Sequence, residues 1–211
     1  MTTADFGPAR VGLVRRSTQL NVATLAYNSL EGILALVAGA LAGSIALTSF
    51  GLDSLIEVAA SLTALWRLRA DVDPARRELT ERVSLRAIGA LFVALAIYVA
   101  IDGASALYRR EAPNQSILGI VVAALSVIVM PLLARAKRNI GMKLGSGALV
   151  AESKQTSLCA YLSVILLGGL VLNATIGWWW ADPVAGLAMV PIIAREGIAG
   201  LRGRSDCADC C

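Results

Sequence analysis

The chain has 211 residues, of which 57% are hydrophobic and only 16% are charged, and its formal net charge is +4. Soluble globular domains are nearer half apolar and a quarter charged, so this composition argues for a polytopic membrane protein. The sequence has no histidine, which removes the commonest metal ligand, and its four cysteines do not form the disulfide framework of a small secreted domain.

Apolar windows of about 20 residues, the length a helix needs to cross a bilayer, follow one another along the chain. They cover residues 19–42, 45–67, 86–108, 115–135, 146–173 and 180–201. Open strands cannot satisfy their backbone in lipid, so we expect an all-α membrane protein of six transmembrane helices. The first window lacks a clear signal-peptide cleavage site and is interpreted as a retained span. Residues 19–203 then form the transmembrane domain, between tails of residues 1–18 and 204–211.

Basic residues gather on one side of these windows. Most Lys and Arg lie in the N-terminal tail, the 67–86 and 135–143 connections and the C-terminal end, whereas the other side holds Arg109 and Arg110. The positive-inside rule therefore predicts that both termini are cytoplasmic, and we expect the protein in the plasma membrane. Trp178, Trp179 and Trp180 then fall at the outer boundary, where indoles anchor helices.

The second window places two carboxylates, Asp53 and Glu57, in the otherwise apolar stretch "SFGLDSLIEVAAS". They are four residues apart, so they share one helix face. By helical rise they lie roughly 12 and 18 Å from the outer surface, near the middle of the bilayer. Two such carboxylates repel unless a proton or cation lies between them. A divalent cation explains the pair, and a structural polar contact between helices is the alternative.

A weak internal repeat extends this pattern to the fifth window. "GSIALTSFGLDSLIEVAAS" from Gly43 aligns with "GSGALVAESKQTSLCAYLS" from Gly145. In this register Asp53 falls on Gln155, and Glu57 falls on Cys159. Repeated segments often supply corresponding half-sites in transporters, so the sequence predicts a four-residue cluster near the midplane. Taken without the repeat, Cys159 is more typical of a small buried apolar residue.

The two stretches, together with "GWWWADPVAGL", resemble signatures of the cation diffusion facilitator family over nearly all of residues 18–204. The resemblance implies proton-coupled export of zinc and other divalent metals, a bundle with both ends inside, and a homodimer. It also implies a tetrahedral metal site, which by position consists of Asp53, Glu57, Gln155 and Cys159. The sequence departs from the family in offering Gln and Cys on the fifth helix. It also lacks the usual cytoplasmic domain after the sixth helix, as in a short branch of the family.

We therefore expect a secondary transporter that exports a metal cation, Zn²⁺ foremost, by proton antiport and alternating access around this site. Because Cys159 is a soft ligand, Cd²⁺, Hg²⁺ and Cu⁺ are alternative substrates. The alternative function is a non-transporting metal sensor or partner membrane protein whose site has drifted. No nucleophile–base constellation suggests an enzyme, and we expect no tightly bound cofactor and no nucleic-acid partner.

An ionisable residue inside a predicted span is a functional hypothesis by default. Besides the pair, we consider the acidic residues Glu31, Asp102 and Glu152. A polar stripe on the first helix ends at Glu31 and also includes Asn21, Thr24 and Asn28. The stripe either lines an ion path or links helices by hydrogen bonds. The candidate path residues are Asn28, Glu31, Asp102 and Glu152.

Three further features carry expectations. Lys154 should pair with a carboxylate on another helix, with Asp102, Glu31 and Glu57 as candidates. Asp182 precedes Pro183 and should cap its own helix. A soft metal in the cytoplasm could be collected by three thiols, those of Cys207, Cys210 and Cys211. The alternative is an incidental or lipid-modified tail.

Overall fold

The computed structural model describes residues 8–69, 74–110, 113–144 and 147–202, which form six helices and no strands. The helices are α1 (Pro8–Ala42), α2 (Ile45–Arg69), α3 (Pro74–Arg109), α4 (Ile117–Leu144), α5 (Gly147–Ile176) and α6 (Ala181–Leu201). Each contains a segment long and apolar enough to cross a membrane. The expected all-α membrane fold is confirmed. Several helices run past the predicted windows, because hydropathy detects only the lipid-like part of a helix.

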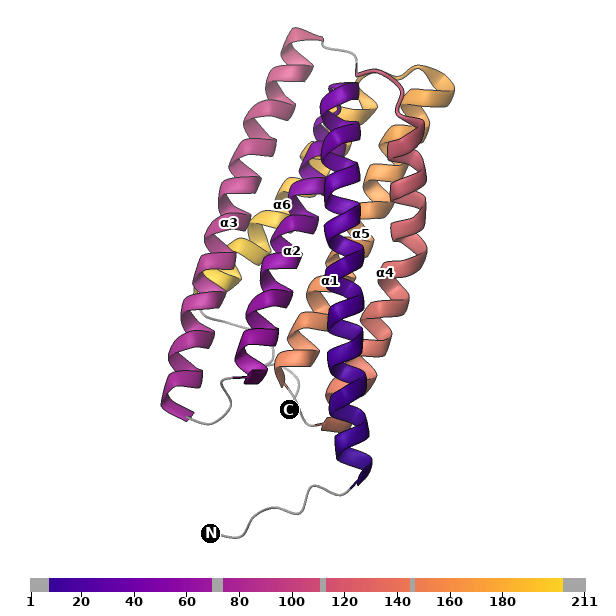
Figure 1. The fold of residues 1–211 in the computed structure, drawn as a ribbon. Coiled ribbons are helices and arrows are strands. Elements are labelled where there is room, and N and C mark those ends of the chain that lie inside the picture. The colour runs from indigo at the N-terminus through magenta and orange to yellow at the C-terminus, as the bar shows by residue number, and fades with distance from the viewer. Residues whose placement is uncertain (1–7, 70–73, 111–112, 145–146, 203–211) are drawn as a thin grey trace.

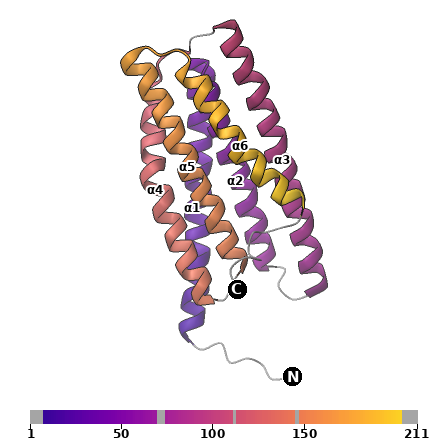
Figure 2. The same cartoon turned by 180° about the vertical axis from the view of Figure 1, so that it is seen from behind.

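The helices form two groups (Figure 1). Helices α1, α2, α4 and α5 pack around a common interior, whereas α3 and α6 pair with each other and lie against α2 and α5. Figure 2 shows α6 running obliquely across the back of the bundle beside α3. We call the end where α1 begins the lower end. The α1–α2, α3–α4 and α5–α6 connections lie at the opposite, upper end.

Close contact between neighbouring helices depends on glycine. A Cβ atom at Gly39 of α1 would lie 2.6 Å from the Thr48 hydroxyl of α2, and one at Gly51 would meet Leu36 at 2.8 Å. The turn between the two helices contains Gly43 at φ 66°, a conformation that glycine adopts without strain. These contacts hold α2 against α1 and fix the direction in which its side chains point.

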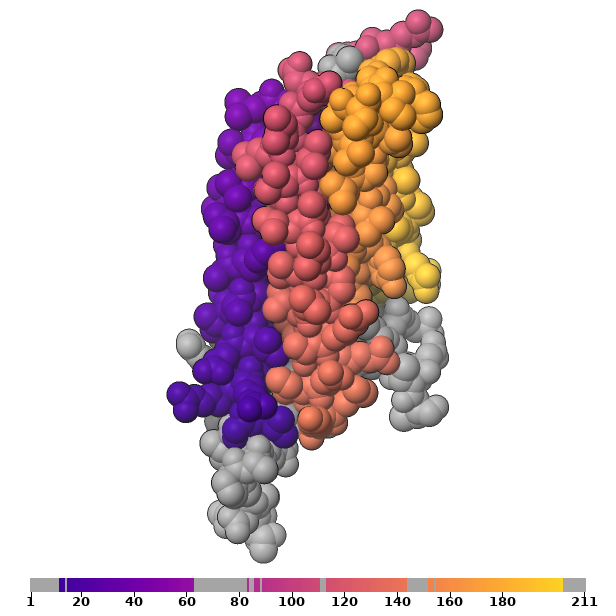
Figure 3. Space-filling view, turned by 90° about the vertical axis from the view of Figure 1, so that its right-hand side faces the viewer, coloured from indigo at the N-terminus to yellow at the C-terminus, as the bar shows by residue number. Residues whose placement is uncertain are grey.

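The bundle is apolar on its outside and buries many polar side chains beside an apolar core. Figure 3 shows α1, α4 and α5 packed side by side on one face. The exposed side chains on α1 and α4 include Leu30, Ile33, Ile128 and Leu132, all at least half exposed. Buried positions on α1, α4 and α5 include serine, threonine, asparagine and glutamate. The apolar outer face fits a lipid environment, and the polar side chains that could carry chemistry lie in the interior.

Candidate metal site

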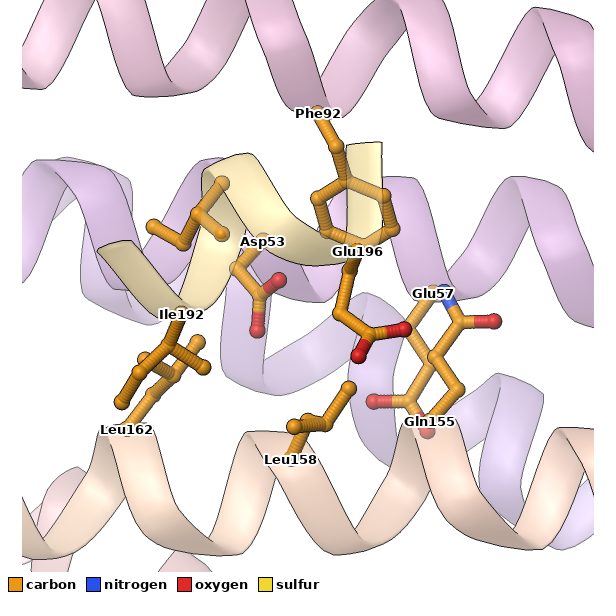
Figure 4. A pocket seen from close by; sticks show the side chains of 9 residues that line it. Asp53, Glu57, Phe92, Gln155, Leu158, Leu162, Ile192 and Glu196 are labelled. Atoms are coloured by element: carbon orange, nitrogen blue, oxygen red, sulfur yellow. The ribbon is translucent and has the colours of Figure 1, made fainter. Parts of the chain in front are cut away.

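Asp53 and Glu57 project from α2 into the interior, where they are 5% and 2% exposed. With Gln155 of α5 they line a cavity of about 10 Å³, the size of a single water molecule. Figure 4 shows the carboxyl groups of Asp53 and Glu196 directed into the space between α2, α5 and α6. The remaining lining is apolar and consists of Phe92, Leu158, Leu162, Ile192 and Ile193.

Cys159 lies one turn beyond Gln155 on α5 and is 1% exposed. Its thiol lies close enough to both Asp53 and Glu57 to interact with their carboxyl groups. The four residues predicted from the repeat are thus neighbours at the α2–α5 interface. Among the residues that the structure describes, however, no three Cys, Asp or Glu side chains are grouped closely enough to hold a metal as they stand. Coordination would require these side chains to move together.

Two atoms at this interface are buried without a hydrogen-bond partner: Glu57 Oε2 and Gln155 Nε2. The other oxygen of Glu57 accepts a hydrogen bond of 2.7 Å from Thr156 Oγ1 on α5. Most buried polar atoms in proteins are hydrogen-bonded, so an unpaired carboxylate oxygen beside a water-sized cavity calls for a bound water or ion.

Below this site lies a second polar group, which we call the Glu152 cluster: Asn21, Ser61, Lys137, Glu152 and Thr156. Lys137 Nζ donates to Glu152 Oε1 at 2.9 Å and to Thr156 Oγ1 at 3.3 Å. Ser61 Oγ donates to Glu152 at 3.2 Å. The Asn21 amide, with its nitrogen turned toward Glu152, reaches the two carboxylate oxygens at 3.0 and 3.2 Å. Groups from three other helices, α1, α2 and α4, therefore meet at this one carboxylate of α5.

The location of Lys137 differs from the predicted one. The sequence placed it in a cytoplasmic connection of residues 135–143, but α4 continues to Leu144 and the lysine is 0% exposed. Glu152, a candidate path residue, therefore has a buried ammonium group as its partner. The side chain of Lys154, which was expected to pair with a carboxylate, lies outside the described residues, as do Cys207, Cys210 and Cys211.

The polar stripe of α1 faces the interior. All four of its members are 3% exposed or less: Asn21, Thr24, Asn28 and Glu31. Ser54 of α2 donates to Glu31 Oε2 at 3.1 Å. Since Ser54 follows Asp53 directly in α2, the structure brings Glu31 close to the candidate site.

Asp102, the remaining candidate path residue, lies apart from this group. It lines a separate cavity of about 340 Å³ near the upper end, together with Tyr98, Ser44 and Asp182. In this arrangement of the helices, Asp102 is therefore not a ligand of the candidate metal site.

Asp182 was predicted to cap its own helix, and this is wrong. The carboxylate lies within the first turn of α6, where Trp180 is the N-cap without a side-chain bond. It instead accepts from the Ser44 hydroxyl and from the backbone N–H groups of Ile45 and Ala46, at 3.0 and 3.5 Å. Asp182 thus caps α2, because the first N–H groups of a helix have no partner within it.

Sequence reasoning missed Glu196, which lines the cavity from α6. The signal was present, since Glu196 lies inside the predicted span of residues 180–201 and meets the same criterion as the other acidic residues. Lys137 offered no such signal, because the apolar window ended two residues before it.

Comparison with known proteins agrees with this arrangement. The cation efflux transmembrane domain matches residues 22–202. An uncharacterized transporter of Synechocystis sp. is 28% identical over 74% of this chain and 52% of its own length. An uncharacterized transporter of Methanocaldococcus jannaschii is 27% identical over 82% and 63%. The cation-efflux pump FieF of Serratia proteamaculans is 31% identical over 79% and 58%.

The chain therefore spans between half and two thirds of the length of these relatives. The matched residues include most of α1, the membrane-spanning parts of the other five helices and the α2–α5 interface. Family match and fold together show that the chain belongs to the cation efflux family, the cation diffusion facilitators, which are membrane transporters and not enzymes.

Proposed function

We propose that the protein exports a divalent metal cation, Zn²⁺ foremost, from the cytoplasm in exchange for protons. The observation that carries the proposal is the buried Asp53–Glu57 pair beside a water-sized cavity, with one Glu57 oxygen unpaired. Two carboxylates in this position repel each other unless cations neutralise them. A transported metal ion supplies that charge in one state, and protons supply it in the other.

The donor set fits zinc. Carboxylate oxygens and a cysteine thiolate are zinc ligands, and Gln155 can add a neutral amide oxygen. Cys159 favours softer ions such as Cd²⁺, Hg²⁺ or Cu⁺ relative to an all-oxygen site. Because carboxylates and thiolates bind metal only when deprotonated, protons arriving from the opposite side compete with the metal and release it.

The route follows from the charge asymmetry of the sequence. With both termini cytoplasmic, the lower end faces the cytoplasm and the upper end faces outward. Metal enters from the lower end along the polar stripe of α1 and past Glu152, and leaves through the upper cavity that Asp102 lines. The pairing of α3 with α6 outside the other four helices supports alternating access, since one group can rock against the other. The plasma membrane location and a homodimer rest on the family resemblance.

The experiment that tests this function is a flux assay in proteoliposomes with an imposed pH gradient and a metal-sensitive dye inside. Asp53→Ala should reduce Zn²⁺ uptake to the level of protein-free liposomes. Ser49→Ala is the matched control, because Ser49 lies one turn earlier on α2 and its hydroxyl bonds to Ile45 O of the same helix. Unchanged uptake in Asp53→Ala would contradict the site. Zinc binding without uptake in the unaltered protein would favour a sensor or partner subunit.

A further inference from the structure

The described interior holds more negative than positive charge. Four carboxylates are buried among α1, α2 and α5: Glu31, Asp53, Glu57 and Glu152. The buried basic side chain that the structure describes among them is Lys137, and it pairs with Glu152. A divalent metal would balance Asp53 and Glu57. Glu31 is then left with one uncompensated negative charge at membrane depth, where an unpaired charge is costly.

The unpaired buried atoms point to the same residue. In the part of the chain that the structure describes, such side-chain atoms occur at two places. One is the candidate metal site, at Glu57 and Gln155. The other is Glu31 Oε1 with both Asn28 Oδ1 and Asn28 Nδ2, although Asn28 is 0% exposed. Asn28 and Glu31 are three residues apart and share one face of α1. A fully buried amide with neither atom bonded calls for an occupant.

The groups around Glu31 define what that occupant is. Ser54 bonds to Oε2 at 3.1 Å, and the hydroxyls of Tyr27 and Ser126 lie beside the same carboxylate. These hydroxyl groups offer oxygen atoms as ligands from α1, α2 and α4. Oxygen ligands suit a hard cation, and a single carboxylate balances a single positive charge. This set differs from the metal site, where two carboxylates meet a thiol.

We propose a second cation site that holds one monovalent cation, Na⁺ or a proton, and is formed by Glu31, Asn28, Ser54 and Ser126. We call it the Glu31 site. Its role as the site of the counter-ion rests on the transport function proposed above. Its existence does not, because the unpaired atoms and the uncompensated charge belong to the bundle itself.

Coupling between the two sites is electrostatic. Glu31 lies within electrostatic range of Asp53 and Glu57, so a cation at the Glu31 site lowers the affinity of the other site for a metal ion. The metal ion lowers the affinity of the Glu31 site by the same factor, and this reciprocal coupling is what exchange requires. The titratable groups that face Glu31 are Tyr27, Asp53, Glu57 and Cys159.

Transport gives the first test, with Glu31→Gln as the variant and Zn²⁺ as the probe. One arm imposes a Na⁺ gradient at equal pH, and the other a pH gradient without Na⁺. Glu31→Gln should weaken Zn²⁺ binding less than Asp53→Ala does, while the extra flux that an imposed gradient drives in the unaltered protein falls about tenfold. Ser29→Ala, which removes a hydroxyl bonded to Leu25 O on the same helix, should keep that flux. Unchanged gradient dependence overturns the proposal. So does a loss of Zn²⁺ binding equal to that of Asp53→Ala, which would make Glu31 a metal ligand.

A second test works without metal or flux, and so separates this site from the transport function. Thermal unfolding in detergent is followed with added NaCl, using N-methyl-D-glucamine chloride as the ionic-strength control. A rise in Tm with Na⁺ that Glu31→Gln abolishes supports Na⁺. A protonated-carboxyl infrared band that Glu31→Gln removes supports a proton.

The absence of both signals overturns the proposal. Either signal in a protein without zinc flux keeps the Glu31 site and removes only its counter-ion role. If Glu31→Gln does not fold, Asn28→Ala and Ser126→Ala should each weaken the signal that the unaltered protein gives. A signal that neither of these two variants weakens would assign the cation to another carboxylate and overturn the proposal as well.

Discussion

Two groups of buried carboxylates lie among the same four helices, and their surroundings differ. Glu152 is paired with the Lys137 ammonium at 2.9 Å and also accepts from Ser61 and, with its amide nitrogen turned inward, Asn21. Glu57 has no such pair: one oxygen accepts from a threonine hydroxyl and the other has no partner.

This difference distinguishes a carboxylate that stabilises the fold from carboxylates that can bind a mobile ion. A tethered ammonium neutralises Glu152 permanently and ties α4 to α5, so that carboxylate is always compensated. Among the described side chains, Lys137 forms its ion pair with Glu152 and is within electrostatic range of Glu57, but no ion pair is formed by the other three carboxylates, Glu31, Asp53 and Glu57. A cation that arrives and leaves can supply their counter-charge. Thr156 joins the two groups, since it accepts from Lys137 and donates to Glu57.

The largest expected effect is on stability, from Lys137→Met. Removing the ammonium leaves Glu152 buried and uncompensated, which should lower the free energy of unfolding by about 3–5 kcal/mol. The measurement is chemical unfolding in mixed micelles. The double variant Lys137→Met/Glu152→Gln should recover most of the loss, because this pair then leaves no buried charge. A loss below about 1 kcal/mol in the single variant would show that the pair is not structural.

Glu57→Gln should have the opposite effect from Lys137→Met: it should weaken zinc binding without lowering stability. Removing an incompletely paired carboxylate should leave the free energy of unfolding unchanged or raise it. Zinc affinity should fall by at least about 10- to 100-fold, the loss that even the removal of a ligand's outer partner causes. Titration calorimetry with Zn²⁺ and unfolding of the same preparation check both parts. A large loss of stability together with intact zinc binding would place Glu57 with Glu152 and remove the distinction between the two groups.

The sequence predicts the helices well, because each contains a long apolar segment. It also predicts that Asp53, Glu57, Gln155 and Cys159 form one cluster, and the structure places them at one interface. Their role as ligands stays a prediction. The spacing of four residues on one helix face and the repeat register were sufficient for this, since both are local properties of α2 and α5.

What the sequence could not supply are partners between distant helices. The Lys137–Glu152 pair depends on how far α4 continues beyond its apolar window. Asp182 caps a helix whose first residue lies 137 positions earlier, and nothing local to α6 indicates that contact. In both cases a local preference was overridden by a partner that only the packing of the bundle provides.

Cys159→Ser sharpens the comparison within the metal site itself. Replacing a soft sulfur by a hard oxygen should lower the ratio of Cd²⁺ to Zn²⁺ affinity by about tenfold. Competition binding of the two metals in detergent measures that ratio. Ser157→Ala on the same helix, whose hydroxyl bonds to Ser153 O, is the control and should leave it unchanged. An unaltered ratio in Cys159→Ser would return this thiol to the role of a small buried residue.

Asp182→Asn should have the smallest effect, because this carboxylate resembles Glu152 in having permanent partners. Its oxygens accept from the Ser44 hydroxyl and from two N–H groups at the start of α2. Asparagine keeps one acceptor oxygen but loses the charge that favours a helix N-terminus, so the free energy of unfolding should fall by about 1 kcal/mol. Zinc affinity should not change. Unfolding and zinc titration of the same variant measure both effects. Lost zinc binding with full stability would show that Asp182 binds a mobile ion and does not stabilise the fold as Glu152 does.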